Sequence, residues 1–173
     1  MGPEGASPPP AADASAVTVR AAAPADVALL HAMIVELAVY EREPDAVTGS
    51  EAMLARALFG PSPCAEALIA EAGGEPAGFA LFFGTFSTWE VLPGIWLEDL
   101  YVRERFRGAG AGRALLEQLA ALTVARGCAR LEWNVLDWNE PALGFYRRIG
   151  ARRMREWDRH RLSGDELRQV AER

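Results

Sequence analysis

The sequence predicts one domain of mixed α/β class, and three observations support that prediction. The chain has 173 residues, an ordinary length for a single domain. Apolar residues make up 50% and charged residues 24%, which is the balance of a globular protein. Strand-like and helix-like stretches alternate along the second half, which indicates strand–helix–strand units. We expect this domain to span residues 17–173.

The N-terminal part predicts a leader, a strand and two helices. Residues 1–16 are rich in Pro, Ala and Gly and lack the basic and apolar regions of a signal peptide, so we expect a disordered leader. Residues 17–20 alternate as in a strand, and residues 24–40 carry apolar side chains at helical spacing. Residues 48–51 have the spacing of a capping box, which predicts a second helix that ends at Gly60.

The remaining elements follow the same rules of periodicity and punctuation. Residues 79–86 are almost continuously apolar, as in a strand covered on both faces. The other expected elements are strands over 67–70 and 95–102, a hairpin turn at 73–76, a helix over 115–127, a strand over 131–136, a helix over 139–150, one or two strands within 152–162, and a C-terminal helix from a second capping box at 163–166.

Charge and composition exclude several classes of function. The 24 acids outnumber the 18 bases, all of which are arginine, and the net charge is −6. This argues against a protein that grips nucleic acid over its whole surface, and the lack of lysine excludes P-loop ATPases and lysine Schiff-base enzymes. Two separate cysteines and no metal-ligand spacing predict a reduced, cytoplasmic protein without a metal. No apolar run is long enough for a membrane span.

The glycine turn, residues 107–112, is the most informative segment. Its alternating glycines allow backbone N–H groups to face outward before a helix, which suits a pyrophosphate. Neighbouring arginines add positive charge at positions 103, 105, 107 and 113. The spacing does not match the Rossmann pattern, and a Walker motif would need a lysine. The alternative is a tight strand-to-helix turn without a ligand.

A family resemblance starts from this turn. Residues Arg107-Gly108-Ala109-Gly110-Ala111-Gly112 fit the Q/R-x-x-G-x-G/A motif of the GNAT acetyltransferases. Residues 97–102 and 137–151 are similar to the L-E-D-x-x-V and W-N-E-P…F-Y-x-x-x-G-A segments of the diamine (spermidine/spermine) acetyltransferases. The resemblance implies a mostly antiparallel, twisted sheet of about six to seven strands flanked by helices. It also implies a splayed strand pair that holds acetyl-CoA, and a homodimer.

The resemblance also implies a set of residues that bind acetyl-CoA. Backbone N–H groups near the thioester carbonyl would come from the end of the strand over 95–102, and the pyrophosphate would lie on the glycine turn. The pantetheine arm would contact Asn139, at the start of the helix over 139–150. The residues are Leu100, Tyr101, Val102, Arg107, Gly108, Ala109, Gly110, Ala111, Gly112, Arg113, Asn139, Pro141, Ala142 and Tyr146.

Two residues are candidates for proton transfer. Glu98 is the candidate base, acting through water, and Tyr146 is the candidate acid toward the departing thiolate. The alternatives are an ion-paired or capping Glu98 and a core tyrosine with its hydroxyl at the surface. Asn139 can equally be a plain helix cap. Because side chains alternate along a strand, we expect Glu98 and Asp99 to face opposite sides unless a bulge intervenes.

The acceptor is expected to be a small primary amine. Tyr40 and Glu41 resemble the Y-E pair at the acceptor site of the diamine acetyltransferases, and Glu98 and Asp99 would add negative charge. A polyamine is the first choice, and thialysine or another amino-acid-like amine is the second. Two further readings remain open: a non-catalytic acyl-CoA-binding regulatory module, and a protein or peptide acetyltransferase.

Overall fold

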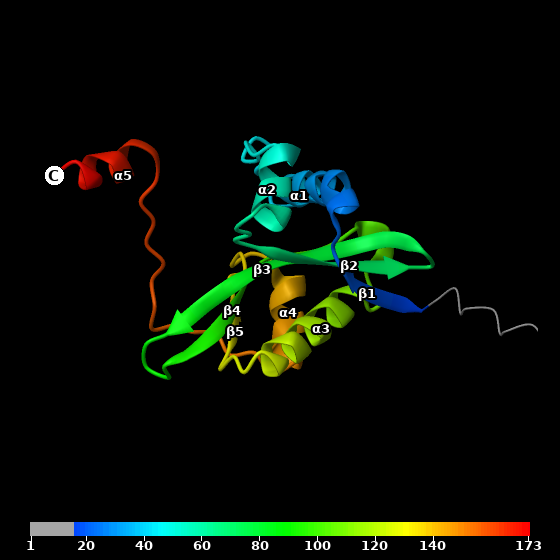
Figure 1. The fold of residues 1–173 in the computed structure, drawn as a ribbon. Coiled ribbons are helices and arrows are strands. Elements are labelled where there is room, and N and C mark those ends of the chain that lie inside the picture. The colour runs from blue at the N-terminus through cyan, green and yellow to red at the C-terminus, as the bar shows by residue number, and fades with distance from the viewer. Residues whose placement is uncertain (1–15) are drawn as a thin grey trace, which may run out of the picture. The chain divides into compact units, whose positions relative to one another are not determined.

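A mixed sheet of five strands forms the centre of the first part of the chain (Figure 1). The protein's structure, a computed structural model, describes residues 16–173, so almost all of the expected leader lies outside the described residues. The strands lie side by side in sequence order, each antiparallel to the one before, except that β5 runs parallel to β4. They are β1 (Val17–Ala21), β2 (Glu66–Ala72), β3 (Glu75–Ser87), β4 (Leu92–Val102) and β5 (Leu131–Trp133).

Three helices belong to this part of the chain: α1 (Val27–Tyr40), α2 (Glu51–Phe59) and α3 (Ala111–Ala125). A 3₁₀ turn, Pro24–Asp26, precedes α1. The predicted cap of α2 at Thr48 was wrong by two residues, because Ser50 stands in extended backbone immediately before the helix. Its Oγ accepts a hydrogen bond from the Met53 amide at 3.3 Å.

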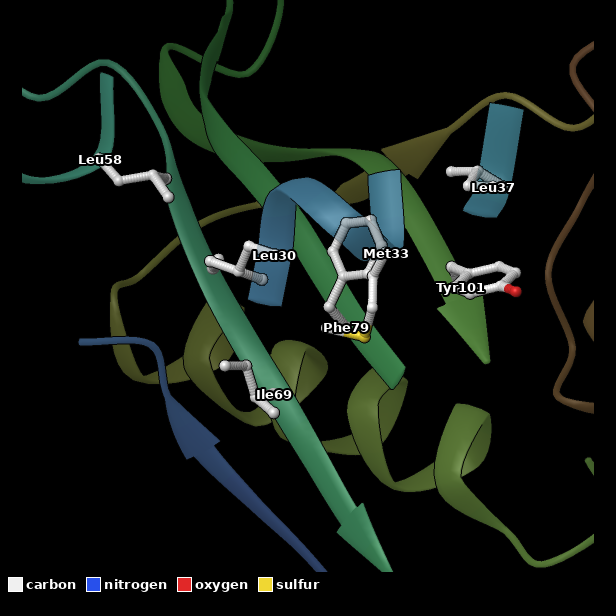
Figure 2. Close-up of a cluster of buried hydrophobic side chains, with 8 residues drawn as sticks. Leu30, Met33, Leu37, Leu58, Ile69, Phe79 and Tyr101 are labelled. Atoms are coloured by element: carbon white, nitrogen blue, oxygen red, sulfur yellow. The ribbon is translucent and has the colours of Figure 1, made fainter. Parts of the chain in front are cut away.

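The helices cover the two faces of the sheet. Figure 1 shows α1 and α2 on one side and α3 on the other. From α1, Leu30 and Met33 pack onto Ile69 and Phe79 of the sheet, and all four side chains have no exposed surface (Figure 2). The opposite face is covered by the apolar stripe of α3, which includes Ala111, Leu115, Leu116 and Leu119. We call these the α1 face and the α3 face.

Residues 135–173 form a second unit with α4 (Glu140–Arg148) and α5 (Gly164–Ala171). The six to seven strands expected from the resemblance are not found within residues 16–173, where the sheet has five. The segment Arg152–Leu162 contains no strand, and all its side chains are exposed. It is dominated by arginines and has no alternation of apolar and polar residues, so it offers a sheet no face to bury. The single domain expected over 17–173 stays a prediction.

Candidate active site

The strands β4 and β5 separate halfway along β4. They pair only where Ile95–Leu97 faces Leu131–Trp133, whereas β4 continues alongside β3 to Val102. From Glu98 to Val102, therefore, the β5 side of β4 has no neighbouring strand within the described part of the chain. We call residues 98–102 on this side the open edge.

Backbone groups of alternate residues point toward the open edge. The Arg103 amide donates to the Ala77 carbonyl at 2.9 Å and so points toward β3. The Val102 carbonyl accepts from the Arg107 side chain at 3.2 Å and so points the other way. Because the direction alternates along a strand, Leu100 also turns its N–H and C=O groups to the open edge, whereas Tyr101 turns its own toward β3. Of the three residues expected to offer amides, Leu100 and Val102 therefore face outward.

A β-bulge at Glu98 sets the direction of the two acids. Asp99 lies opposite Leu81 and Leu97 lies opposite Phe82, so Glu98 is an extra residue on β4. Leu97 points to the α3 face, and Asp99 lies in register with Leu81, which packs on the α1 cluster. The bulge thus directs both Glu98 and Asp99 to the α1 face. We expected Glu98 and Asp99 to face opposite sides unless a bulge intervened. A bulge does intervene, so the two side chains share one face.

Asp99 feels the negative charges of two other carboxyl groups, Glu98 and Glu41, and we call these three residues the acidic trio. Burial, and then repulsion from Glu98 and Glu41, raises the pKa of Asp99 to about 6. Burial also raises the pKa of Glu41, which follows the last residue of α1. Two members of the trio, Asp99 and Glu41, are therefore partly dehydrated, and the negative charge of the trio favours a cation that displaces water from them.

The Glu98 side chain is exposed and is held by one strong contact. The indole Nε1–H of Trp96 donates to Glu98 Oε2 at 2.8 Å. The two residues are two positions apart, and Trp96 lies opposite Phe83, so both side chains are on the α1 face. The second carboxylate oxygen, Oε1, has the capacity to accept a hydrogen bond from water or an amine.

The glycine turn contains two glycines in the left-handed region of backbone conformation. Gly108 and Gly110 adopt φ of +84° and +93°, with open space where a side chain would begin. Ala111, Gly112 and Arg113 form the first turn of α3, where backbone amides have no acceptor inside the helix. The Ala109 amide instead donates to the Phe106 carbonyl at 3.3 Å. The turn therefore offers amides from the start of α3 to an anion.

The four arginines around the turn have different surroundings. Arg103 makes a bidentate ion pair with Glu36 of α1, at 2.7 and 2.9 Å. Arg105 and Arg113 pair with Glu75 and Glu117, each at 2.7 Å. The Arg107 guanidinium lies over the ring of Tyr40, with Cζ 4.6 Å from the centroid. In the sequence, the four arginines read as one basic patch. In the structure, each of them contacts a different partner.

The remaining predicted residues lie in the second unit. Asn139 caps α4, because its Oδ1 accepts a hydrogen bond from the Ala142 amide at 3.3 Å, and Pro141 lies in the first turn. Tyr146 follows Asn139 by seven residues on the same helix, about two turns later. Burial raises the pKa of the Tyr146 phenol to about 12, so the hydroxyl keeps its proton at neutral pH.

Sequence reasoning missed two contacts, the Trp96–Glu98 hydrogen bond and the Glu36–Arg103 ion pair. The Trp96–Glu98 bond could have been found from their i, i+2 spacing on a strand. The Glu36–Arg103 pair joins positions 67 residues apart, and no local pattern points to it.

Within residues 16–173 no cluster of three or more His, Cys, Asp or Glu is arranged to hold a metal ion. Every helix within the described residues 16–173 is too short or too polar to cross a membrane.

Similar proteins of known activity match over most of the chain. The Thialysine N-epsilon-acetyltransferase of Sus scrofa is 36% identical over 168 residues, covering 91% of this chain and 98% of the relative. The L-ornithine N5-acetyltransferase of Arabidopsis thaliana is 29% identical and covers 88% and 86%. A human spermidine/spermine N(1)-acetyltransferase-like protein is 31% identical over 80% of this chain, which corresponds to 21% of that longer protein.

The fold and a family model agree with these relatives. An integron cassette protein from V. cholerae superposes with a TM-score of 0.76 at 27% identity, covering 91% of this chain and 98% of the other. The model of the Acetyltransferase (GNAT) family matches residues 30–151, from α1 to the end of α4. The open edge, the glycine turn and the α4 segment all lie inside this match. The family resemblance inferred from the motifs is confirmed, and the chain belongs to the GNAT acetyltransferase family.

Proposed function

We propose that this enzyme moves the acetyl group of acetyl-CoA to a small primary amine, and that a polyamine or diamine is its preferred acceptor. The acidic trio is the observation that carries the choice of acceptor. Three carboxyl groups on the α1 face favour a molecule with more than one positive charge, because one ammonium cannot neutralise them all.

The open edge and the glycine turn support the binding of acetyl-CoA. Leu100 turns its amide and carbonyl, and Val102 its amide, to the open edge of an extended strand, which suits the amide groups of a pantetheine arm, whereas the Val102 carbonyl already accepts from Arg107. An amide at this edge can also stabilise the negative charge that develops on the thioester oxygen. A few residues later, the first turn of α3 offers its amides to the pyrophosphate.

Proton transfer requires a base for the amine and an acid for the thiolate. The bulge directs Glu98 to the α1 face with Oε1 able to hydrogen-bond, so it can take a proton from the ammonium through a water molecule. The neutral amine then attacks the thioester carbon, and the C–S bond breaks to release the CoA thiolate. Tyr146, which stays protonated at neutral pH, supplies a proton to that sulfur, and the proton that the acetylated nitrogen releases restores the phenol.

The names of the relatives favour a second acceptor class. Thialysine and ornithine are amino acids with a side-chain amine, and enzymes named for them match this chain over most of its length. An amino acid also brings a carboxylate, which needs a cationic partner. Arg107, which lies over Tyr40 next to Glu41, could provide one. We keep amino-acid-like amines as the alternative acceptor.

A panel of amines tests the proposal. Purified protein is mixed with acetyl-CoA and spermidine, putrescine, thialysine or ornithine, and free CoA thiol is measured. The expected result is release that depends on the amine, with the highest kcat/KM for spermidine or putrescine. The highest value for thialysine would establish the alternative. Binding of CoA without release for any amine would support a regulatory module and contradict the enzyme.

The assembly implied by the resemblance is a homodimer, and it forms part of this proposal. Light scattering on the purified chain gives its mass in solution. A mass of one chain at enzyme assay concentration would contradict a dimer without affecting the proposed chemistry.

A further inference from the structure

Three segments meet at the side chain of Arg107. Its guanidinium lies over the ring of Tyr40, the last residue of α1, with Cζ 4.6 Å from the ring centroid. Its Nε donates to the Val102 carbonyl, at the end of β4, at 3.2 Å. Its own backbone begins the glycine turn, and Gly108, with φ of +84°, follows immediately. One side chain thus joins the end of α1, the open edge and the glycine turn.

This arrangement distinguishes Arg107 from the other arginines of the segment. Arg103, Arg105 and Arg113 each pair with a carboxylate, although Arg105 also lies over the ring of its neighbour Phe106, whereas Arg107 contacts the ring of Tyr40, 67 residues away, and the Val102 carbonyl. A planar guanidinium can lie flat on a ring and donate from its edge at the same time, and the ammonium of lysine cannot. The geometry therefore depends on arginine at this position and on an aromatic ring at position 40.

We propose that Arg107 is a positioning residue that couples the amine site to the glycine turn through Tyr40. Tyr40 neighbours Glu41 of the acidic trio, so an amine bound there restricts the end of α1. The restricted Tyr40 ring then limits the movement of the Arg107 guanidinium. Through its side chain, the backbone of Arg107 is also restricted, and this residue is the first of the glycine turn. This inference rests on the proposed function, because it takes the trio as the amine site and the turn as the CoA site.

Coupling of this kind is reciprocal. If spermidine tightens the binding of CoA by some factor, CoA must tighten the binding of spermidine by the same factor. A tyrosine that only lines the amine site would change the affinity for amine and leave that for CoA unaltered. The affinity for CoA in variants of Tyr40, measured with and without spermidine, therefore separates coupling from simple contact with substrate.

The experiment measures the Kd of CoA, which cannot react, by calorimetry with and without saturating spermidine. Tyr40→Phe keeps the ring and should bind CoA like the wild type. Tyr40→Leu removes the ring and should raise the Kd of CoA by about two- to five-fold, the effect of one exposed cation–π contact. In an Arg107→Lys background, Tyr40→Leu should cause no further loss, because the contact is already absent. Arg105→Lys, in the same segment but paired with Glu75, is the matched control and should leave the effect of Tyr40→Leu intact.

A second readout uses the free protein and does not depend on ligand. Amide hydrogen exchange across residues 107–112 should be faster in Tyr40→Leu than in the wild type and Tyr40→Phe. Unchanged exchange together with an unchanged Kd for CoA in Tyr40→Leu would overturn the coupling. If the wild type failed to bind CoA while the exchange effect persisted, the proposed function would be wrong and the contact between Tyr40 and the turn would stand.

Discussion

Replacing Asp99 by Asn should make the protein more stable at neutral pH and less able to bind a diamine. Asp99 has its pKa raised from the ordinary value of 3.8 to about 6 by burial and by the charges of Glu98 and Glu41. Above pH 6 the carboxyl is ionised in both the folded and unfolded states, and the folded state carries the cost of a buried charge. As the pH falls from 6 to about 4, the folded state takes up the proton first, so the free energy of unfolding rises. Below that range both states are protonated and the effect is complete.

The size of the effect follows from the two pKa values. At about 1.4 kcal/mol for each pH unit, the difference between 3.8 and about 6 corresponds to at most about 3 kcal/mol. Asp99→Asn should gain up to this amount at pH 7.5 and almost nothing at pH 4. Urea unfolding of the wild type and the variant at several pH values measures the difference. Glu43→Gln, which removes an exposed carboxylate just after Glu41, controls for the change in net charge.

Two results would refute this reasoning. A stability difference that stays constant between pH 4 and pH 8 would mean that the Asp99 carboxyl carries no cost of ionisation in the folded state. A variant with unchanged KM for putrescine would mean that Asp99 does not face the acceptor. Stabilisation accompanied by a raised KM is the outcome expected of a charge that folding disfavours and that function requires.

Three further predictions concern the remaining site residues. Tyr146→Phe should lower kcat about 100-fold, because the thiolate loses its proton donor, while the Kd of CoA measured by calorimetry stays the same. Trp96→Phe should lower kcat about ten-fold in the thiol-release assay, because Glu98 loses a charge-assisted hydrogen bond that orients it. Gly110→Ala should lower the free energy of unfolding in urea by about 1–2 kcal/mol, because φ of +93° is unfavourable for alanine.

Each of these has a matched control or a contrary outcome. Equal turnover in Tyr146→Phe would remove its role as the acid. Trp89→Phe, at an 85% exposed position in the β3–β4 connection, should leave kcat unchanged, and an equal loss there would exclude a specific role for Trp96. Gly49→Ala also meets open space but without a positive φ, so a similar loss of stability there would contradict the argument from backbone conformation.

The elements of the chain were largely predictable because their signals are local. The apolar spacing of α1 and α3, and the consecutive Gly73 and Gly74 between β2 and β3, depend on neighbours within a few residues. The errors arose where local rules compete. Thr48 and Ser50 can both cap a helix, and in the structure Ser50 is the cap because it directly precedes the first helical residue. Residues 152–162, where one or two strands were expected, are dominated by arginines and have no apolar face to bury.

The sequence by itself determined the mixed α/β class, the glycine turn, the acetyltransferase family and the types of residue that could carry the chemistry. Only the tertiary structure decided that a bulge directs Glu98 and Asp99 to the same face, that Glu41 approaches Asp99, and that Arg107 lies on Tyr40. The physical reason is distance along the chain. Motifs and periodicity follow from contacts between near neighbours, whereas the register of paired strands depends on which faces they bury together. The approach of α1 to β4 depends on how segments more than fifty residues apart pack their apolar side chains.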